Sequence, residues 1–273
     1  MATIAEQLTT LANTKTAIKD AIVAKGVQVA DTDPFSAYPA KIGQISGGGA
    51  PATKFGASVD TWLGDVDENG VLQPTTWTGA LNFAGVKKIA SRALVYAFYE
   101  NKGLTSVDLS SLQSVEINSL LYTFYNCNNI TSVDLSSLQS VNTSGMDHAF
   151  NNCKGLTSVN LSSLQSVKSN GLYYTFADCN NITSVDLSSL QSVGSNGLNS
   201  AFSACKILNS MSFPSLTDVQ ANSFGTSLYA YVFRDCSALT EIHFRADMQA
   251  TIEAMSGYAD KWGATNATIY FDL

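Results

Sequence analysis

Four copies of one 26-residue unit follow each other without a gap between Leu104 and Ile207. Each copy opens on an apolar core, Leu104-x-x-Val107-x-Leu109 in the first, and ends shortly after a cysteine. A period of this length means that one unit forms one coil, which can bury its apolar face only against its neighbours. The repeat therefore predicts a solenoid of stacked coils.

The L-x-x-V-x-L spacing is typical of leucine-rich repeats. We predict an α+β repeat protein: a leucine-rich repeat solenoid of about 26 residues per coil, with a parallel β-sheet on one face and a small helical region before it. Such solenoids offer long, regular surfaces and seldom enclose an active-site cleft. Recognition is therefore a better first inference than catalysis.

The chain divides by composition into 1–46, 47–53, 54–80 and 81–273. Residues 1–46 are predicted to be a helical region for attachment or oligomerisation. Its residues Ile4, Leu11 and Ile18 share one heptad position, which favours a helix that pairs or trimerises, although a helix packed on its own domain fits equally well. Residues 47–53 are Gly-rich and are interpreted as a linker.

Residues 54–80 are predicted to form a β-hairpin that leads into the solenoid, because Asn69-Gly70 lies between alternating apolar residues. Asp65, Asp67 and Asn69 also match the first half of a calcium-binding EF-hand loop. Position twelve of that loop is Thr76 in place of the required Glu, so a hairpin turn is the better interpretation.

The solenoid, 81–273, begins and ends with atypical coils. In the first, Phe98 aligns with Phe124 but Asn101 replaces the cysteine. Near the other end, 208–238 is a copy with about five extra residues around 223–231, and 267–273 is predicted to be a capping strand. Atypical terminal coils are expected, because their outer surfaces must tolerate water.

The net charge of −7 comes from 22 acidic and 15 basic residues, and Lys and Arg form no cluster. These features disfavour nucleic acid and anionic membranes as partners. No apolar stretch approaches about 18 residues, and the first 20 residues lack the pattern of a secretory signal. No membrane insertion is therefore expected.

All five cysteines occupy the same place in their repeats: Cys127, Cys153, Cys179, Cys205 and Cys236. Stacked coils would bring them close enough to be bridged, but the odd number favours five buried, reduced thiols. Zinc is disfavoured because the set lacks C-x-x-C spacing and nearby His. Neither a metal nor a cofactor is predicted.

Catalytic residues are not predicted either. His148 and His243 are about four coils apart, and no catalytic or nucleotide-binding motif occurs. The recurring carboxylates look equivalent and solvated, whereas a glycosidase pair needs two distinct ones. We therefore expect a protein that is not an enzyme.

Two surfaces are candidates for binding. One is the outward row of the sheet face, Asp108, Asp134, Asn160 and Asp186, although hydrated side chains are the simpler interpretation. The other is the window in which the copies differ. Large side chains are concentrated there: Tyr122, Tyr125, His148, Tyr173 and Tyr174. Varied aromatic residues on rigid coils are good contact residues, so we favour this window, although relaxed packing in a loop would also explain the variation.

The repeats, with L-T-S-V-D-L, S-L-Q-S-V and a Phe-x-x-Cys junction, resemble the BspA-like leucine-rich repeats of bacterial surface and adhesion proteins over about residues 78–244. The stretch 11–45, with I-K-x-A-I-x-x-K-G-V and a Tyr-Pro-x-Lys-Ile end, is similar to segments of bacteriophage tail-fibre and other tail proteins. The two resemblances together imply a phage virion protein with a leucine-rich tip.

We therefore expect a virion structural protein, a fibre or baseplate appendage assembled in the host cytoplasm. Its N-terminal region would contact other virion proteins and form a homo-oligomer, preferably a trimer. Its solenoid would recognise a host surface receptor, either glycan or protein. The alternatives are a purely structural decoration protein of the virion and a BspA-like bacterial adhesin.

Overall fold

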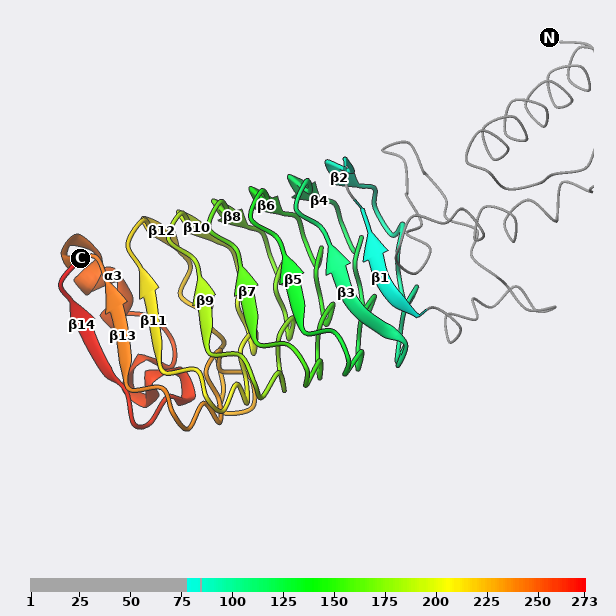
Figure 1. Ribbon diagram of the computed structural model, residues 1–273. Helices are drawn as coiled ribbons and strands as arrows, with labels where there is room; N and C mark the ends of the chain where they lie inside the picture. The colour runs from blue at the N-terminus through cyan, green and yellow to red at the C-terminus, as the bar shows by residue number, and fades with distance from the viewer. Residues whose placement is uncertain (1–77, 84) are drawn as a thin grey trace, which may run out of the picture. The chain divides into compact units, whose positions relative to one another are not determined.

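The computed structural model describes residues 78–83 and 85–273. The predicted N-terminal helix, the linker and nearly all of the predicted hairpin lie outside the described residues. The described part is a stack of parallel coils in which residue i lies beside residue i+26 (Figure 1). Each coil has three sides.

The first side is a parallel sheet, called the sheet face. Val133 pairs with Val159, and Asp134 with Asn160. In β5 and β7 the exposed outward side chains lie on either side of a buried valine, as the sequence predicts. The strands in order are β1 (Gly79–Asn82), β3 (Leu104–Asp108), β5 (Ser132–Asp134), β7 (Ser158–Asn160) and β9 (Ser184–Asp186).

A second parallel sheet forms the next side of the coils. Each of its strands is two residues long, and the inward residue of most pairs is a buried Val or Ile. The strands in order are β12 (Asp218–Val219), β10 (Ser192–Val193), β8 (Ser166–Val167), β6 (Ser140–Val141), β4 (Ser114–Val115) and β2 (Lys88–Ile89).

The third side, called the turn face, consists of turns that are hydrogen-bonded from coil to coil. Tyr122 N donates to Asp147 O at 3.0 Å in the next coil, whereas Thr123 N donates to Leu120 O in its own turn. Tyr122 has a φ of +54°, and the same left-handed geometry recurs every fourth residue, at Asn118 and Asn126. This alternation keeps the turns from continuing into an α-helix.

The core runs along the axis of the stack. Leu109, Leu112 and Phe124 are fully buried, as are their counterparts in the following coils. The phenylalanines form a column with near-parallel rings, for example Phe124 and Phe150 with ring centres 5.0 Å apart. Identical positions therefore pack on one another, which explains why the repeats are so uniform.

The five cysteines are free thiols and are buried, in the position the sequence predicts. Their sulfurs donate weak hydrogen bonds to phenylalanine carbonyls one coil earlier, at 3.0–3.3 Å. Burial raises the pKa of Cys127 to about 12, and raises the pKa of Cys153 well above its usual value. These thiols are therefore protonated at neutral pH.

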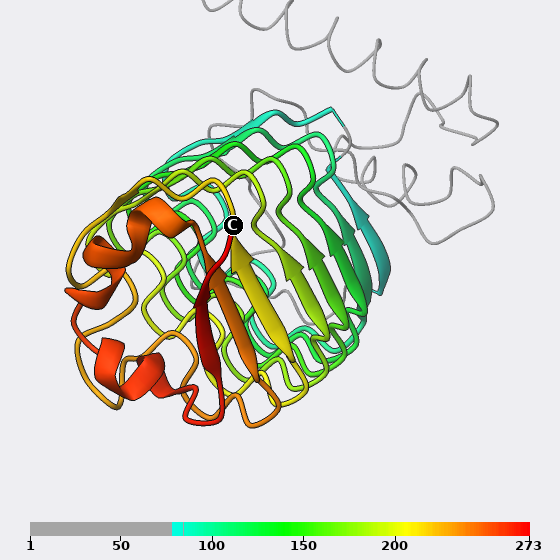
Figure 2. The ribbon, with the colours of Figure 1, turned by 90° about the vertical axis from the view of Figure 1, so that its left-hand side faces the viewer.

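The C-terminal end is closed by a third parallel sheet and by short helical segments (Figure 2). The buried ring of Trp262 packs edge-on against Phe224 and Phe244 and covers the end of the core. The elements are β11 (Ser210–Phe213), β13 (Glu241–Phe244), η3 (Ala246–Met248), α3 (Gln249–Glu253), η4 (Tyr258–Gly263) and β14 (Thr268–Phe271).

The extra residues of the longer copy loop out of the turn face. Leu198 N bonds Ser223 O in the regular way, but the next pairing of this side joins Ser200 N to Ala230 O. The loop 225–229 between these two points carries the exposed side chains of Leu228 and Tyr229. The coils on both sides of this loop keep their stacking.

Two expectations about the fold need correction. A parallel sheet was expected on one face, but parallel strands occupy two sides of the coils. The α+β class is not confirmed: within the described residues the only α-helix is α3, of five residues. The physical reason is that the side opposite the sheet face turns through left-handed residues such as Tyr122 and cannot hold a helix.

Candidate functional site

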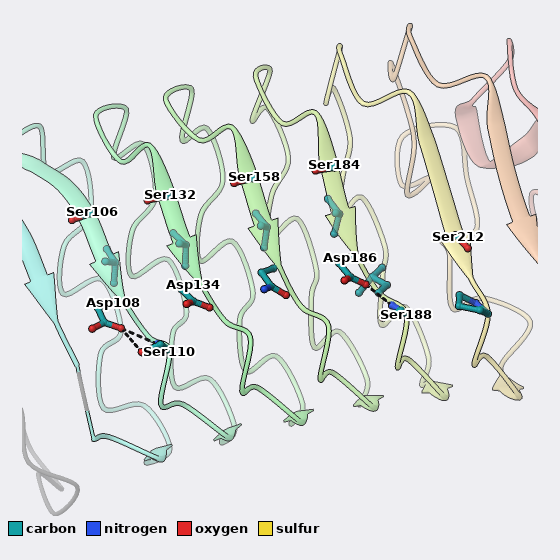
Figure 3. A pocket seen from close by; sticks show the side chains of 17 residues that line it. Ser106, Asp108, Ser110, Ser132, Asp134, Ser158, Ser184, Asp186, Ser188 and Ser212 are labelled. Atoms are coloured by element: carbon teal, nitrogen blue, oxygen red, sulfur yellow. Dashed lines mark hydrogen bonds between the residues drawn. The ribbon is translucent and has the colours of Figure 1, made fainter.

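The sheet face carries a trough of about 930 Å³ that runs across β3, β5, β7 and β9 (Figure 3). Its lining is polar and regular: one row of serines and one row of Asp or Asn run along the stack, two residues apart on each strand. The trough contains all four residues of the sheet-face alternative, Asp108, Asp134, Asn160 and Asp186.

Each of these four side chains also has a structural task. Asp108 Oδ1 accepts hydrogen bonds from the backbone N of Ser110 at 3.0 Å and from its hydroxyl at 2.6 Å. Asp134, Asn160 and Asp186 accept from the backbone N two residues ahead, at 2.9–3.0 Å. This bond stabilises the turn after each strand. In each Asp the second oxygen makes no hydrogen bond with a described residue.

The serine row lies beside these carboxylates. The side chains of Ser132, Ser158 and Ser184 are exposed, and their hydroxyls have no hydrogen-bond partner among the described residues. Three of the residues that line the trough carry carboxylates, and within this lining none is Lys, Arg or His. The trough therefore offers hydrogen-bonding oxygens together with negative charge.

The turn face brings together the five aromatic side chains predicted as a binding window. Tyr122 stacks on His148, with ring centres 4.3 Å apart, and His148 stacks on Tyr174 at 4.9 Å. Tyr125 is tilted against Tyr122, and Tyr173 lies edge-on to Tyr174. We call this set, together with Tyr96 and Tyr99, the aromatic ladder.

Tyr96 and Tyr99 were missed as members of this set. They stack on Tyr122 and Tyr125, at 5.1 and 4.8 Å. The signal was present in the sequence, since each stands 26 residues before the ring on which it stacks. It was overlooked because the first coil is degenerate at most other positions.

Much of the ring surface in the aromatic ladder is used within the protein. Burial raises the pKa of Tyr122 to about 12, and burial also raises the pKa of Tyr173. His148 Nδ1 contacts the carboxylate of Asp147, and the Tyr174 hydroxyl donates to Tyr229 O at 3.0 Å. The ladder therefore contacts the loop 225–229 through Tyr174.

The second histidine lies at the C-terminal end of the sheet face. His243 Nδ1 lies 2.9 Å from Asp272 Oδ1, and its Nε2 lies 3.5 Å from Glu241. The hydrogen bond to Asp272 is the main cause of a raised pKa of His243. The ring also stacks on Tyr270 at 4.8 Å. This cluster joins β13 to β14.

Neither a metal site nor a membrane-spanning helix is found among the described residues. Over the described ranges, 78–83 and 85–273, no group of three or more His, Cys, Asp or Glu could hold a metal ion. In the same part of the chain, none of the helices has the length and apolar character needed to cross a membrane.

Comparison with known proteins points to one family. The model of the BspA type leucine-rich repeat region, in six copies, matches residues 94–228 and 174–256, which together are more than half of the chain. No curated protein matches.

Solved structures of leucine-rich repeat proteins are similar at low identity. One from T. pallidum is 20% identical, covers 74% of this chain and 78% of its own, and has a TM-score of 0.42. One from Bacteroides ovatus ATCC 8483 is 17% identical, covers 70% of this chain and 60% of its own, and has a TM-score of 0.26. The family match and these two structures concern leucine-rich repeat proteins and name no virion protein.

Proposed function

The chain belongs to the BspA-type leucine-rich repeat family, and from that premise we propose that it is a recognition protein that binds an extended partner along its sheet face. The observation that carries the proposal is the trough over β3, β5, β7 and β9. It repeats the same hydrogen-bonding groups in successive coils. A long partner can therefore contact several coils at once, which is how solenoids use their extended surfaces.

The trough is a better candidate than the aromatic ladder because its polar groups have remaining hydrogen-bonding capacity. The serine hydroxyls and the second oxygen of each Asp make no hydrogen bond with a described residue. In the aromatic ladder, by contrast, rings such as His148 are stacked on both sides. The ladder is therefore assigned to packing, and recognition to the trough.

The finer proposal places this recognition on a virion. We propose a fibre or baseplate appendage whose solenoid binds a host surface receptor and whose residues 1–46 attach it to other virion proteins. The support is the similarity of residues 11–45 to phage tail proteins, in a stretch outside the described residues. The family match also fits a BspA-like adhesin, and a decoration protein that binds only its own virion remains a third alternative.

Blocking the trough tests the role of the sheet face. Ser158→Tyr places a ring at the centre of the trough, and Lys168→Tyr places the same ring at an exposed position just after β8. The full chain should bind cells of a susceptible bacterial host, Ser158→Tyr should reduce that binding at least tenfold, and Lys168→Tyr should leave it unchanged.

Two results would contradict the proposal. Equal binding by the Ser158→Tyr variant and the natural chain would exclude the trough. Binding to purified virions but to no bacterial cell would favour a decoration protein.

A further inference from the structure

We propose that the partner in the trough is an extended polypeptide segment with cationic side chains, held by the free oxygens of Asp134 and Asp186, which lie two coils apart, and by the serine row. This inference rests on the proposed function, because it names the chemistry of the partner for the same surface. Its support comes from charge, from the shape and lining of the trough, and from the spacing of its groups.

Charge gives the first argument. Asp108 and Asp134 lie opposite each other on neighbouring strands, so their carboxylates are about 5 Å apart and repel each other. One oxygen of each is occupied by the turn after the strand, and no basic side chain lines the trough to neutralise the other. A Lys or Arg side chain of a partner would relieve this repulsion and donate the hydrogen bonds that these oxygens accept.

The lining gives the second argument, and it favours a peptide over a glycan. The trough is lined by Ser, Asp, Asn, Val, Leu and Pro side chains, and none of its described lining residues is aromatic. It therefore offers no ring face on which a sugar could pack. Its serine hydroxyls can donate hydrogen bonds to the C=O groups of an extended backbone, which a polypeptide presents at every residue.

Spacing gives the third argument and defines the conformation of the peptide. Neighbouring coils are about 4.8 Å apart, so Asp134 and Asp186, which are two coils apart, are separated by about 9.6 Å. A polyproline II helix advances about 3.1 Å per residue and repeats every three residues, or about 9.3 Å. A segment with a cationic residue at every third position therefore matches alternate coils of the trough.

The chain itself supplies a conservative variant for the test. Asn160 occupies the Asp position in β7 and accepts the same hydrogen bond, from Ser162 N at 3.0 Å. Replacing Asp134 and Asp186 by Asn therefore removes two charges but keeps both turns. The reverse change, Asn160→Asp, adds a carboxylate to the row. Thermal unfolding of each variant checks that the fold is unchanged.

The experiment measures binding of the full chain to a fluorescent (Pro-Pro-Lys)₄ peptide, with (Pro-Pro-Glu)₄ and a peptide of the same composition with all lysines adjacent as controls. The natural chain should bind the first peptide best, and binding should weaken as salt is raised. The double Asn variant should bind about tenfold more weakly, and Asn160→Asp about two- to fivefold more tightly, as expected for exposed ion pairs.

Equal binding of the lysine and glutamate peptides, or an unchanged affinity of the double Asn variant, would overturn the inference. Cell binding that survives protease treatment of the cells but is lost after periodate oxidation would indicate a glycan and would also overturn it.

A different result would show that the trough is not a recognition surface at all. If Ser158→Tyr abolishes cell binding while the lysine peptide does not bind, the trough is a recognition surface for other chemistry. If Ser158→Tyr leaves cell binding intact, the trough itself is excluded.

Discussion

The thiol of Cys153 donates to the backbone carbonyl of Phe124 one coil earlier, with sulfur and oxygen 3.1 Å apart. The same relationship joins Cys179 to Phe150 and recurs in the coils on both sides. Each coil is therefore linked to its predecessor by a side-chain bond inside the core as well as by backbone bonds. The Phe124 carbonyl also accepts a hydrogen bond from the backbone N of Cys127 at 3.2 Å, so the thiol is a second, weak donor carried by a small side chain that fits the core.

Alkylation should distinguish the native from the unfolded protein. All five thiols are buried, and burial raises their pKa values, so the reactive thiolate is scarce at neutral pH. We expect almost no iodoacetamide modification of the native chain. In denaturant without reductant, mass spectrometry should find five modified thiols, and a smaller number would show that some cysteines are paired.

Asn101 should be the most sensitive polar residue of the first coil. Its buried side-chain oxygen accepts hydrogen bonds from Gly103 N at 2.8 Å and from Leu104 N at 2.9 Å. Asn101→Ala should lower the free energy of unfolding by about 1–3 kcal/mol, because it removes both bonds in a buried place. Gln139→Ala, at an exposed side chain, is the control and should change it by less than about 0.5 kcal/mol in a denaturant titration. Equal effects would refute the role of Asn101.

The link between β13 and β14 should depend on pH through His243. Its hydrogen bond to Asp272 and the nearby Glu241 raise its pKa, so the charged imidazole stabilises this end below about pH 6.5. That contribution is lost as the pH rises through the raised pKa of the folded state. Hydrogen exchange of the Tyr270 amide should therefore be better protected at pH 6 than at pH 8, after correction for intrinsic rates. In His243→Gln this difference should disappear, and its persistence would assign it to another group.

Substitutions in the aromatic ladder should show whether its rings serve packing or binding. Tyr174→Ala should lower the free energy of unfolding by about 1–3 kcal/mol, because it removes the stack on His148 and the contact that fixes the loop at Tyr229. Tyr174→Phe keeps the stack and should lose less. If Tyr173→Ala and Tyr174→Ala together reduce cell binding while thermal stability stays within a few degrees, the recognition surface is the aromatic ladder instead of the trough.

The N-terminal region is predicted to drive assembly. Ile4, Leu11 and Ile18 share a heptad position, and a Gly-rich segment separates them from the solenoid. Sedimentation should give about three times the monomer mass for the full chain and the monomer mass for a fragment that starts at Lys54. Monomeric masses for both would refute the prediction.

The strand pairing of the sheet face was predictable because it follows directly from the period. Asp108 and Asp134 are 26 residues apart and lie opposite each other, as the repeat requires. The turn face was not predictable in the same way. Its left-handed residues include Tyr122 and Tyr174, and tyrosine carries no local signal for a positive φ. Their conformation is held by hydrogen bonds to neighbouring coils, which a single repeat does not reveal.

The candidate sites, too, were only partly predictable from the sequence. The sequence placed Asp134 and Asp186 on the outer side of the sheet, but their bonds to the following turns became visible only with the backbone in place. Likewise, the aromatic window was recognised as a group, but nothing in the spacing of Tyr122 and His148 showed that their rings stack on each other. The sequence identified the side chains on each surface, but the backbone geometry determines which of their polar groups and rings are free to contact a partner.

The hydrogen bonds that run from coil to coil on all three sides also determine how the solenoid responds to mechanical force. The strands lie across the axis of the stack (Figure 1), so tension applied to the two ends loads these bonds one coil at a time. Each coil that detaches releases 26 residues, or roughly 90 Å of extended chain. The solenoid would therefore lengthen in steps under tension, and each step would dissipate mechanical energy.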